Sequence, residues 1–154
     1  MSDPKVVVER RIAAPAGKVW EALTDLRGMP SVLSGVEAVE VLTEGPFTVG
    51  TRWIETRRMF GKQATEEMRI TVCEPSTRYV AEADSHGAHY VSEFALSESG
   101  PDVTTVRMTF SATPPGGFAG LVSKLLGGLG AKAVAKAVTQ DLDDVAAAVE
   151  RSAR

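Results

Sequence analysis

The chain has 154 residues, of which 44% are hydrophobic and 24% charged, so it can bury a core and has the composition of an ordinary globular protein. Its 17 Lys and Arg residues are outnumbered by 20 Asp and Glu residues; the net charge of −3 argues against a nucleic-acid-binding surface. No run of about 18 apolar residues is visible, so we expect no transmembrane helix. No secretory signal is visible, and the single cysteine, Cys73, suits a reducing compartment, so we expect a cytoplasmic protein.

The chain opens with a predicted strand followed by two short helices. Residues 5–12 alternate and are rich in β-branched side chains, which predicts the strand. Pro15 is well placed to open a helix over residues 16–23. Residues 25–33 contain a glycine and a proline and predict a short, irregular second helix.

Six further segments have the β-rich pattern of strands, with turn residues between them. They are residues 36–42, 51–59, 62–73, 78–83, 89–96 and 103–113. Residues 97–102 are rich in Ser, Gly and Pro and predict a turn before the last strand. The alternation is one-sided, as in an antiparallel sheet with one covered face. In the fourth strand, for example, it places Met68, Ile70 and Val72 on that face.

The last third of the chain predicts a long helix. Apolar residues recur at spacings of three, four and five over residues 118–151, which at ~1.5 Å per residue would be roughly 50 Å long. Glycines at 127, 128 and 130 interrupt this segment, so an alternative is a helix that starts near Gly130 after a separate short helix. Such a helix must lie across the sheet to bury its apolar stripe. If the sheet curls around it without closing, a cavity is left between them.

Three segments carry a family resemblance: VERRIAAP at residues 8–15, VWEALTD at 19–25, and GTRWIETR at 50–57, followed by Gly61-Lys62. With the order of elements, they resemble the START-like, or Bet v 1-like (SRPBCC), superfamily, in particular the polyketide cyclase/dehydrase and lipid-transport group. The resemblance implies one α+β domain over residues 1–154 with the helix-grip fold. In that fold a curved seven-stranded antiparallel sheet wraps around a long C-terminal helix, with two short helices after the first strand and a hydrophobic cavity inside. Members include lipid carriers and aromatase/cyclases, so the fold does not determine the function.

Charged residues in phase with the covered face are the strongest candidates for a polar site. If Trp53 points inward, Glu55 and Arg57 share its face, and Glu66 is in phase with Met68. Because buried charges need partners, we expect Glu55, Arg57 and Glu66 to form an ion-pair cluster that lines the cavity. Such a cluster would recognise a polar group on a mostly apolar ligand or assist acid–base chemistry. The alternative is the opposite strand phase, or a bulge that leaves these side chains in water at the mouth.

The predicted ligand-binding residues share the inward face of the strands or belong to the helical segment. They are Trp53, Glu55, Arg57, Glu66, Met68, Tyr90, Phe94, Met108, Phe110 and Leu125.

Other chemically active side chains have simpler interpretations. Tyr79 and Tyr90 either present a phenol to a ligand or pack with the hydroxyl at the rim. His86 and His89 flank a turn, and no third ligand is in phase, so we expect neither a metal nor a cofactor. If the two histidines point to the cavity mouth instead, they are the groups that titrate near neutral pH. Cys73 is expected to be an inert core residue rather than a nucleophile.

Three functional hypotheses follow. The first is a binding protein for a small hydrophobic molecule such as a lipid, a polyketide or an isoprenoid. The second is a polyketide cyclase or aromatase, in which Arg57 stabilises an enolate, Glu55 holds Arg57 or takes the proton, and Tyr90 binds a carbonyl. The third is a protein-interaction or stress-associated domain, which an exposed apolar patch on the glycine-rich part of the helix would favour. A homodimer formed through that helix is a further possibility.

Overall fold

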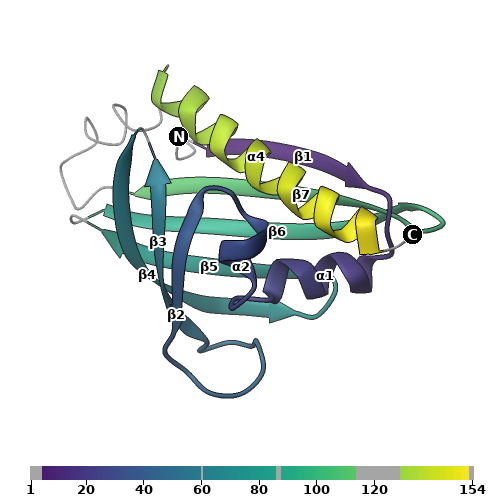
Figure 1. The fold of residues 1–154 in the computed structure, drawn as a ribbon, viewed down its shortest axis with the longest axis horizontal. Helices are drawn as coiled ribbons and strands as arrows, with labels where there is room; N and C mark the ends of the chain where they lie inside the picture. The colour runs from purple at the N-terminus through teal and green to yellow at the C-terminus, as the bar shows by residue number, and fades with distance from the viewer. Residues whose placement is uncertain (1–4, 60, 86–87, 114–128, 153–154) are drawn as a thin grey trace.

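The computed structural model describes residues 5–59, 61–85, 88–113 and 129–152. Within them, seven antiparallel strands form one curved sheet in the order β1-β7-β6-β5-β4-β3-β2 (Figure 1). The strands are β1 (Lys5–Ile12), β2 (Val36–Val41), β3 (Arg52–Met59), β4 (Lys62–Glu74), β5 (Arg78–Ser85), β6 (Ala88–Gly100) and β7 (Val103–Thr113). The helices are α1 (Ala16–Thr24), α2 (Met29–Val32) and α4 (Leu129–Ser152), and Figure 1 shows all three on the same side of the sheet. The predicted helix-grip architecture is therefore confirmed.

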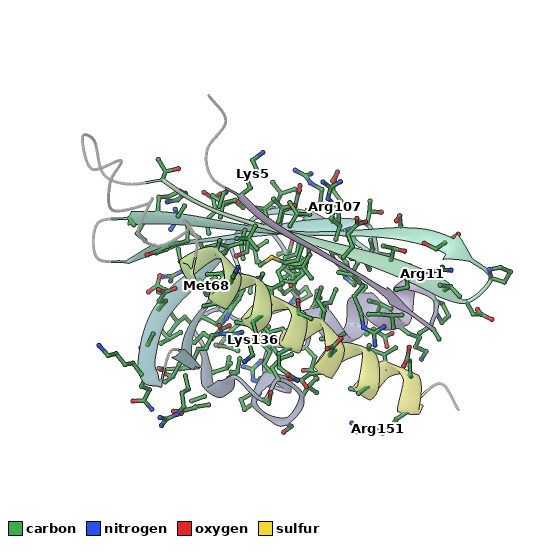
Figure 2. The ribbon with its side chains drawn as sticks, turned by 90° about the horizontal axis from the view of Figure 1, so that it is seen from above. Lys5, Arg11, Met68, Arg107, Lys136 and Arg151 are labelled. Atoms are coloured by element: carbon green, nitrogen blue, oxygen red, sulfur yellow. The ribbon has the colours of Figure 1, made fainter. Side chains whose placement is uncertain are left out.

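The strand pattern explains why one face of the sheet is covered. In β7, Val106 and Met108 are buried against the helices, whereas the intervening Arg107 is exposed. Figure 2 shows the sheet curving around α4, with Arg107 and Lys5 on the face away from that helix. Alternation along the strands thus separates an inner, concave face from a solvated outer face.

The predicted turn over residues 97–102 is wrong in its extent. Strand β6 continues to Gly100, because Glu98 pairs with Thr104 and Gly100 pairs with Val103 across an irregularity in the ladder. Only Pro101 and Asp102 are left for the turn. The composition of this segment does not indicate the extension, because Ser and Gly at the exposed end of a strand can still make backbone hydrogen bonds to the neighbouring strand.

The predicted face of Val72 is also wrong. Ile70 pairs with Ala81 and Val72 pairs with Val80, so the register shifts by one residue between them. Such a bulge moves the following side chain to the other face of the sheet. As a result, Cys73, opposite the buried Tyr79, packs against the inner core in place of Val72.

Helix α4 spans 24 residues, or roughly 36 Å, and buries one stripe against the sheet. The buried residues are Val134, Val138, Leu142, Val145, Ala146 and Val149. Residues 114–128 lie outside the described residues, so the continuity of the helix before Leu129, the predicted ligand contact of Leu125 and the proposed apolar patch remain predictions. Across the described part of the chain, none of the helices has the length and apolar character needed to cross a membrane.

Polar contacts on either side of the apolar stripe hold α4 in place. They are the ion pair of Arg10 with Asp143 (2.9 Å), the bonds donated by the Ser34 amide and hydroxyl to Asp144 (both 2.9 Å), and the bond donated by the Ala13 amide to Glu150 (2.9 Å). Helix α4 is therefore attached to β1, to the segment after β1 and to the segment after α2.

Candidate functional site

A cavity of about 270 Å³ lies between the concave face of the sheet and the helices α1, α2 and α4. Nine of the ten predicted ligand-binding residues line it, all of them on strands. They are Trp53, Glu55, Arg57, Glu66, Met68, Tyr90, Phe94, Met108 and Phe110. The tenth, Leu125, lies outside the described residues. As predicted, Trp53, Glu55 and Arg57 share the face of β3 that is directed toward the cavity.

Most of the cavity wall is apolar and aromatic. Met29 and Leu33 line it from α2 and its C-terminal end. On the sheet, the rings of Tyr90 and Phe110 stack with centroids 5.8 Å apart. Such a wall suits an apolar ligand, and the few polar groups among it would set the ligand's orientation.

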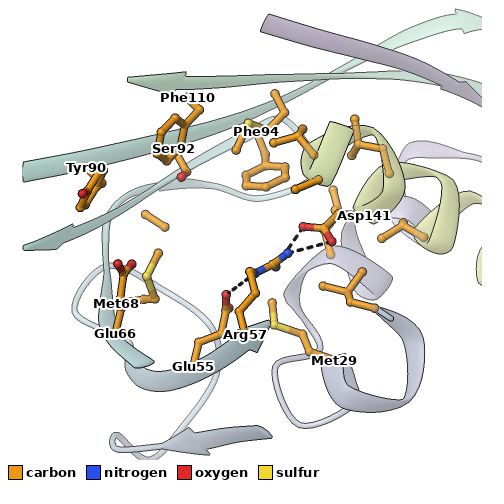
Figure 3. Close-up of a pocket in the computed structure, with 18 of the residues that line it drawn as sticks. Met29, Glu55, Arg57, Glu66, Met68, Tyr90, Ser92, Phe94, Phe110 and Asp141 are labelled. Carbon is orange, nitrogen blue, oxygen red and sulfur yellow. Dashed lines mark hydrogen bonds and ion pairs between the residues drawn. The ribbon is translucent and has the colours of Figure 1, made fainter. Parts of the chain in front are cut away.

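One polar cluster crosses the cavity from the sheet to α4 (Figure 3). Arg57 on β3 donates from Nε to Glu55 at 3.2 Å and from Nη1 to Asp141 at 3.0 Å, and its Nη2 lies 2.9 Å from the second oxygen of Asp141. The indole of Trp53 donates to the other oxygen of Glu55 at 3.3 Å. All three charged side chains are less than a fifth exposed. The guanidinium group of Arg57 is thus oriented by two carboxylates at once.

Burial and charge act against each other in this cluster. Burial alone would lower the pKa of the Arg57 guanidinium. The negative charges of Asp141 and then Glu55, and the hydrogen bonds that they accept from Arg57, outweigh burial and raise that pKa. Burial raises the pKa of Asp141, and its pairing with Arg57 only partly opposes this. Two carboxylates share a single guanidinium, so the cluster retains a formal negative charge.

The predicted cluster of Glu55, Arg57 and Glu66 is wrong in one member. Glu66 lines the cavity directly opposite Glu55 in the ladder, but within the described chain no ion pair or hydrogen bond involves its side chain. Asp141 takes its place. Sequence reasoning missed Asp141, although it lies three residues after Val138 and four before Val145, within the apolar stripe of α4. A charged residue at such a position indicates a buried partner.

Two further hydroxyl groups face the cavity and were not in the predicted set. Tyr79 and Ser92 line the cavity with exposed fractions of 4% and 9%. In the part of the chain that the structure describes, no hydrogen bond satisfies either hydroxyl. Burial raises the pKa of Tyr79, and the charges of Glu55 and Asp141 raise it further, so its phenol stays protonated. Burial, and then Glu66, also raise the pKa of Tyr90.

The remaining reactive side chains lie away from the cavity. His89 lies on the outer face between Asp84 (2.7 Å) and Glu82 (2.6 Å), so it does not point to the cavity mouth; His86 lies outside the described residues. Among the side chains that are described, no three His, Cys, Asp or Glu residues are placed to hold a metal ion. Burial raises the pKa of the Cys73 thiol, which agrees with an unreactive cysteine.

Comparison with known proteins gives the same fold. A model of the family described as polyketide cyclase/dehydrase and lipid transport matches residues 3–150. An aromatase/cyclase from a Streptomyces species superposes with a TM-score of 0.81 at 21% identity, over 97% of this chain and 95% of that one. A Thermus thermophilus protein gives a TM-score of 0.78 at 23% identity, over 98% of this chain and all of that one.

A START superfamily protein from Mycobacterium smegmatis superposes with a TM-score of 0.68 at 14% identity, over 96% of this chain and 95% of that one. No curated protein is significantly similar to the chain in sequence. At these identities, the structural likeness shows the fold alone.

Proposed function

Since the chain belongs to the polyketide cyclase/dehydrase and lipid transport family, we propose that it binds a small, largely hydrophobic molecule in the cavity between the sheet and α4. The finer assignment is a carrier of a lipid, a polyketide or an isoprenoid. The observation that carries the proposal is a cavity of about 270 Å³ whose wall combines stacked aromatic rings with an ion-pair cluster. A folded protein fills its core closely, so an opening of this size needs an occupant or a function.

A substitution that fills the cavity tests this proposal. Ala137 lines the cavity from α4, whereas Ala147 is exposed on the same helix and serves as the matched control. We expect Ala137→Leu to weaken binding of naphthylmethanol, a neutral apolar probe, by at least about tenfold, since extra methylene groups would occupy the probe's space. Ala147→Leu should bind the probe as the wild type does. Equal affinities of all three proteins in calorimetric titrations would place the binding site elsewhere.

Binding should also stabilise the native state. A ligand that binds only the folded protein stabilises it by about 2.7 kcal/mol at a free concentration of 100 times the Kd. We therefore expect the probe to raise the Tm of the wild type and of Ala147→Leu, and to leave that of Ala137→Leu nearly unchanged.

The arrangement also supports a second candidate, a polyketide cyclase or aromatase. Arg57 has five N–H donors, and its contacts with Glu55 and Asp141 use three of them. Two N–H groups remain to stabilise an enolate oxygen formed from a β-ketone. In this mechanism a carboxylate of the cluster takes the proton from the carbon between two carbonyls, and Tyr90 donates a hydrogen bond to the carbonyl under attack.

Turnover of a cyclisable β-polyketone separates the two candidates. Arg57→Ala and Tyr90→Phe should each lower kcat by at least about a hundredfold if these groups assist the reaction. Unchanged turnover in both variants would remove the enzymatic candidate and leave the carrier. Circular dichroism of each variant identifies loss of folding as a separate cause.

A further inference from the structure

The polar groups that line the cavity have an excess of negative charge. Glu55, Glu66 and Asp141 contribute three carboxylates, and Arg57 is the one cation among the described residues of the wall. The positive charge of Arg57 is already paired with Glu55 and Asp141, although two of its N–H groups are not used in these contacts. Glu66 is therefore left without a counter-charge in the described part of the site.

The position of Glu66 makes this imbalance costly. Glu55 and Glu66 are direct partners in the β3–β4 ladder and face the same cavity, and like charges in such a pair repel each other. Figure 3 shows Glu66 on the same side of the cavity as Tyr90, away from the contact between Arg57 and Asp141. A positive group placed beside Glu66 would relieve the repulsion and lie on the same side of the cavity as the Tyr90 ring.

Hydroxyl groups on the cavity wall give a second, independent indication of a polar ligand group. Ser92 and Tyr79 are 9% and 4% exposed, and no hydrogen bond satisfies them within the described chain. In Figure 3 the Ser92 hydroxyl is directed into the cavity. Because a ligand that fills the cavity displaces water from these hydroxyls, a ligand with hydrogen-bonding groups would be favoured over a pure hydrocarbon.

We propose that the cavity selects an amphiphile with an apolar body and a protonated amine, whose ammonium group pairs with Glu66 on a mostly apolar wall. This inference rests on the proposed ligand-binding function and names the class of ligand. The ammonium donates a charge-assisted hydrogen bond to the Glu66 carboxylate. A carboxylate of the same shape, such as a fatty acid, meets a net negative wall whose only described cation is already paired, so the cavity rejects it.

Matched ligands test the proposal at neutral pH. Naphthylmethylamine, naphthylmethanol and naphthoate share an apolar body and carry a cationic, a neutral and an anionic head group. In calorimetric titrations we expect the amine to bind about tenfold more tightly than the alcohol, as one charge-assisted hydrogen bond would give, and naphthoate to bind most weakly. The same three head groups on a decyl chain cover a second ligand shape.

Variants at neighbouring positions separate charge from structure. Glu66→Gln should bring the amine and the alcohol to the same affinity, and Glu66→Lys should give preference to the carboxylate. Glu67→Gln is the control, because Glu67 is exposed and pairs with Arg52 outside the cavity. It should keep the amine preference of the wild type.

The outcomes distinguish the head-group preference from the binding function. Tight binding of the alcohol with no gain for the amine would overturn the amine proposal and leave the hydrophobic-ligand function standing. Tighter binding of the carboxylates than of the amines would also overturn it. If no ligand of either shape binds, both the amine preference and the broader binding function are wrong for these compounds.

Discussion

Arg57 is the residue on which the polar wall of the cavity depends. It holds Glu55 and Asp141 together, and each of these would otherwise be a carboxylate with little access to water. Removing one partner of a buried pair costs more than the pair contributes, since the other charge stays buried.

We therefore expect Arg57→Met to lower the free energy of unfolding by about 3 kcal/mol, the lower end for buried pairs because these side chains keep some solvent access. Asp141→Asn should cost less, since Glu55 still pairs with Arg57. Urea denaturation measures both changes. Arg58→Met is the control: Arg58 is the next residue, 61% exposed, and pairs with Glu37 on the surface. An equally large effect of Arg58→Met would contradict the special role of Arg57.

His89 gives the outer face a pH-dependent contact. Hydrogen bonds that the carboxylates of Asp84 and Glu82 accept from the ring raise the pKa of His89 above its ordinary value of 6.5. The bond with His89 lowers the pKa of Asp84, and the neighbouring Thr71 hydroxyl and then His89 lower that of Glu82. The contribution of His89 is complete below pH 6.5 and is lost as the pH rises through its raised pKa. The contribution of the carboxylates is complete above pH 4.5 and is lost as the pH falls.

The cluster should therefore stabilise the fold most between pH 4.5 and 6.5. Thermal unfolding of the wild type and of His89→Gln across this range measures the effect. We expect the Tm difference between them to be largest near pH 5.5 and to shrink toward alkaline pH. A difference that is constant with pH would show that the ionised histidine makes no contribution.

At the scale of elements, α4 controls the geometry of the cavity through its acidic side chains. Asp144 accepts two hydrogen bonds from Ser34, in the segment that joins α2 to β2. Because Met29, Val32 and Leu33 line the cavity just before Ser34, this contact positions one wall.

Asp144→Ala should free that segment without unfolding the protein. We expect the Ser34 amide to exchange its hydrogen about tenfold faster, as the loss of one moderately strong hydrogen bond would give. Asp143→Ala is the matched control, because Asp143 pairs with Arg10 on β1 instead. If exchange at Ser34 is the same in both variants, Asp144 does not hold the segment.

Local patterns in the sequence were enough to predict the elements and the phase of β3. Trp53 sets the alternation, and Glu55 and Arg57 follow it in a strand without irregularities. The face of Val72 could not be predicted, because a bulge adds one residue to β4 without a change in composition. The contact of Arg57 with Asp141 joins residues 84 positions apart, and only the fold brings such positions together.

At the scale of the whole molecule, α4 spans the opening of a sheet that does not close. Strands β1 and β2 form the two edges, and α4 is tied to β1 by Asp143 and to β3 by Asp141. The cavity lies behind this helix, so the apolar stripe of α4 and the concave face of the sheet surround the same space. The membership of the family and this mostly apolar cavity both support a binding function.

Native mass spectrometry of the protein purified from its own host, followed by a denaturing run, tests that central claim most directly. We predict one small, largely apolar molecule per chain, released on denaturation, and its loss from Ala137→Leu but not from Ala147→Leu. An empty wild-type protein that also fails to take up apolar ligands of either head-group charge would contradict the account.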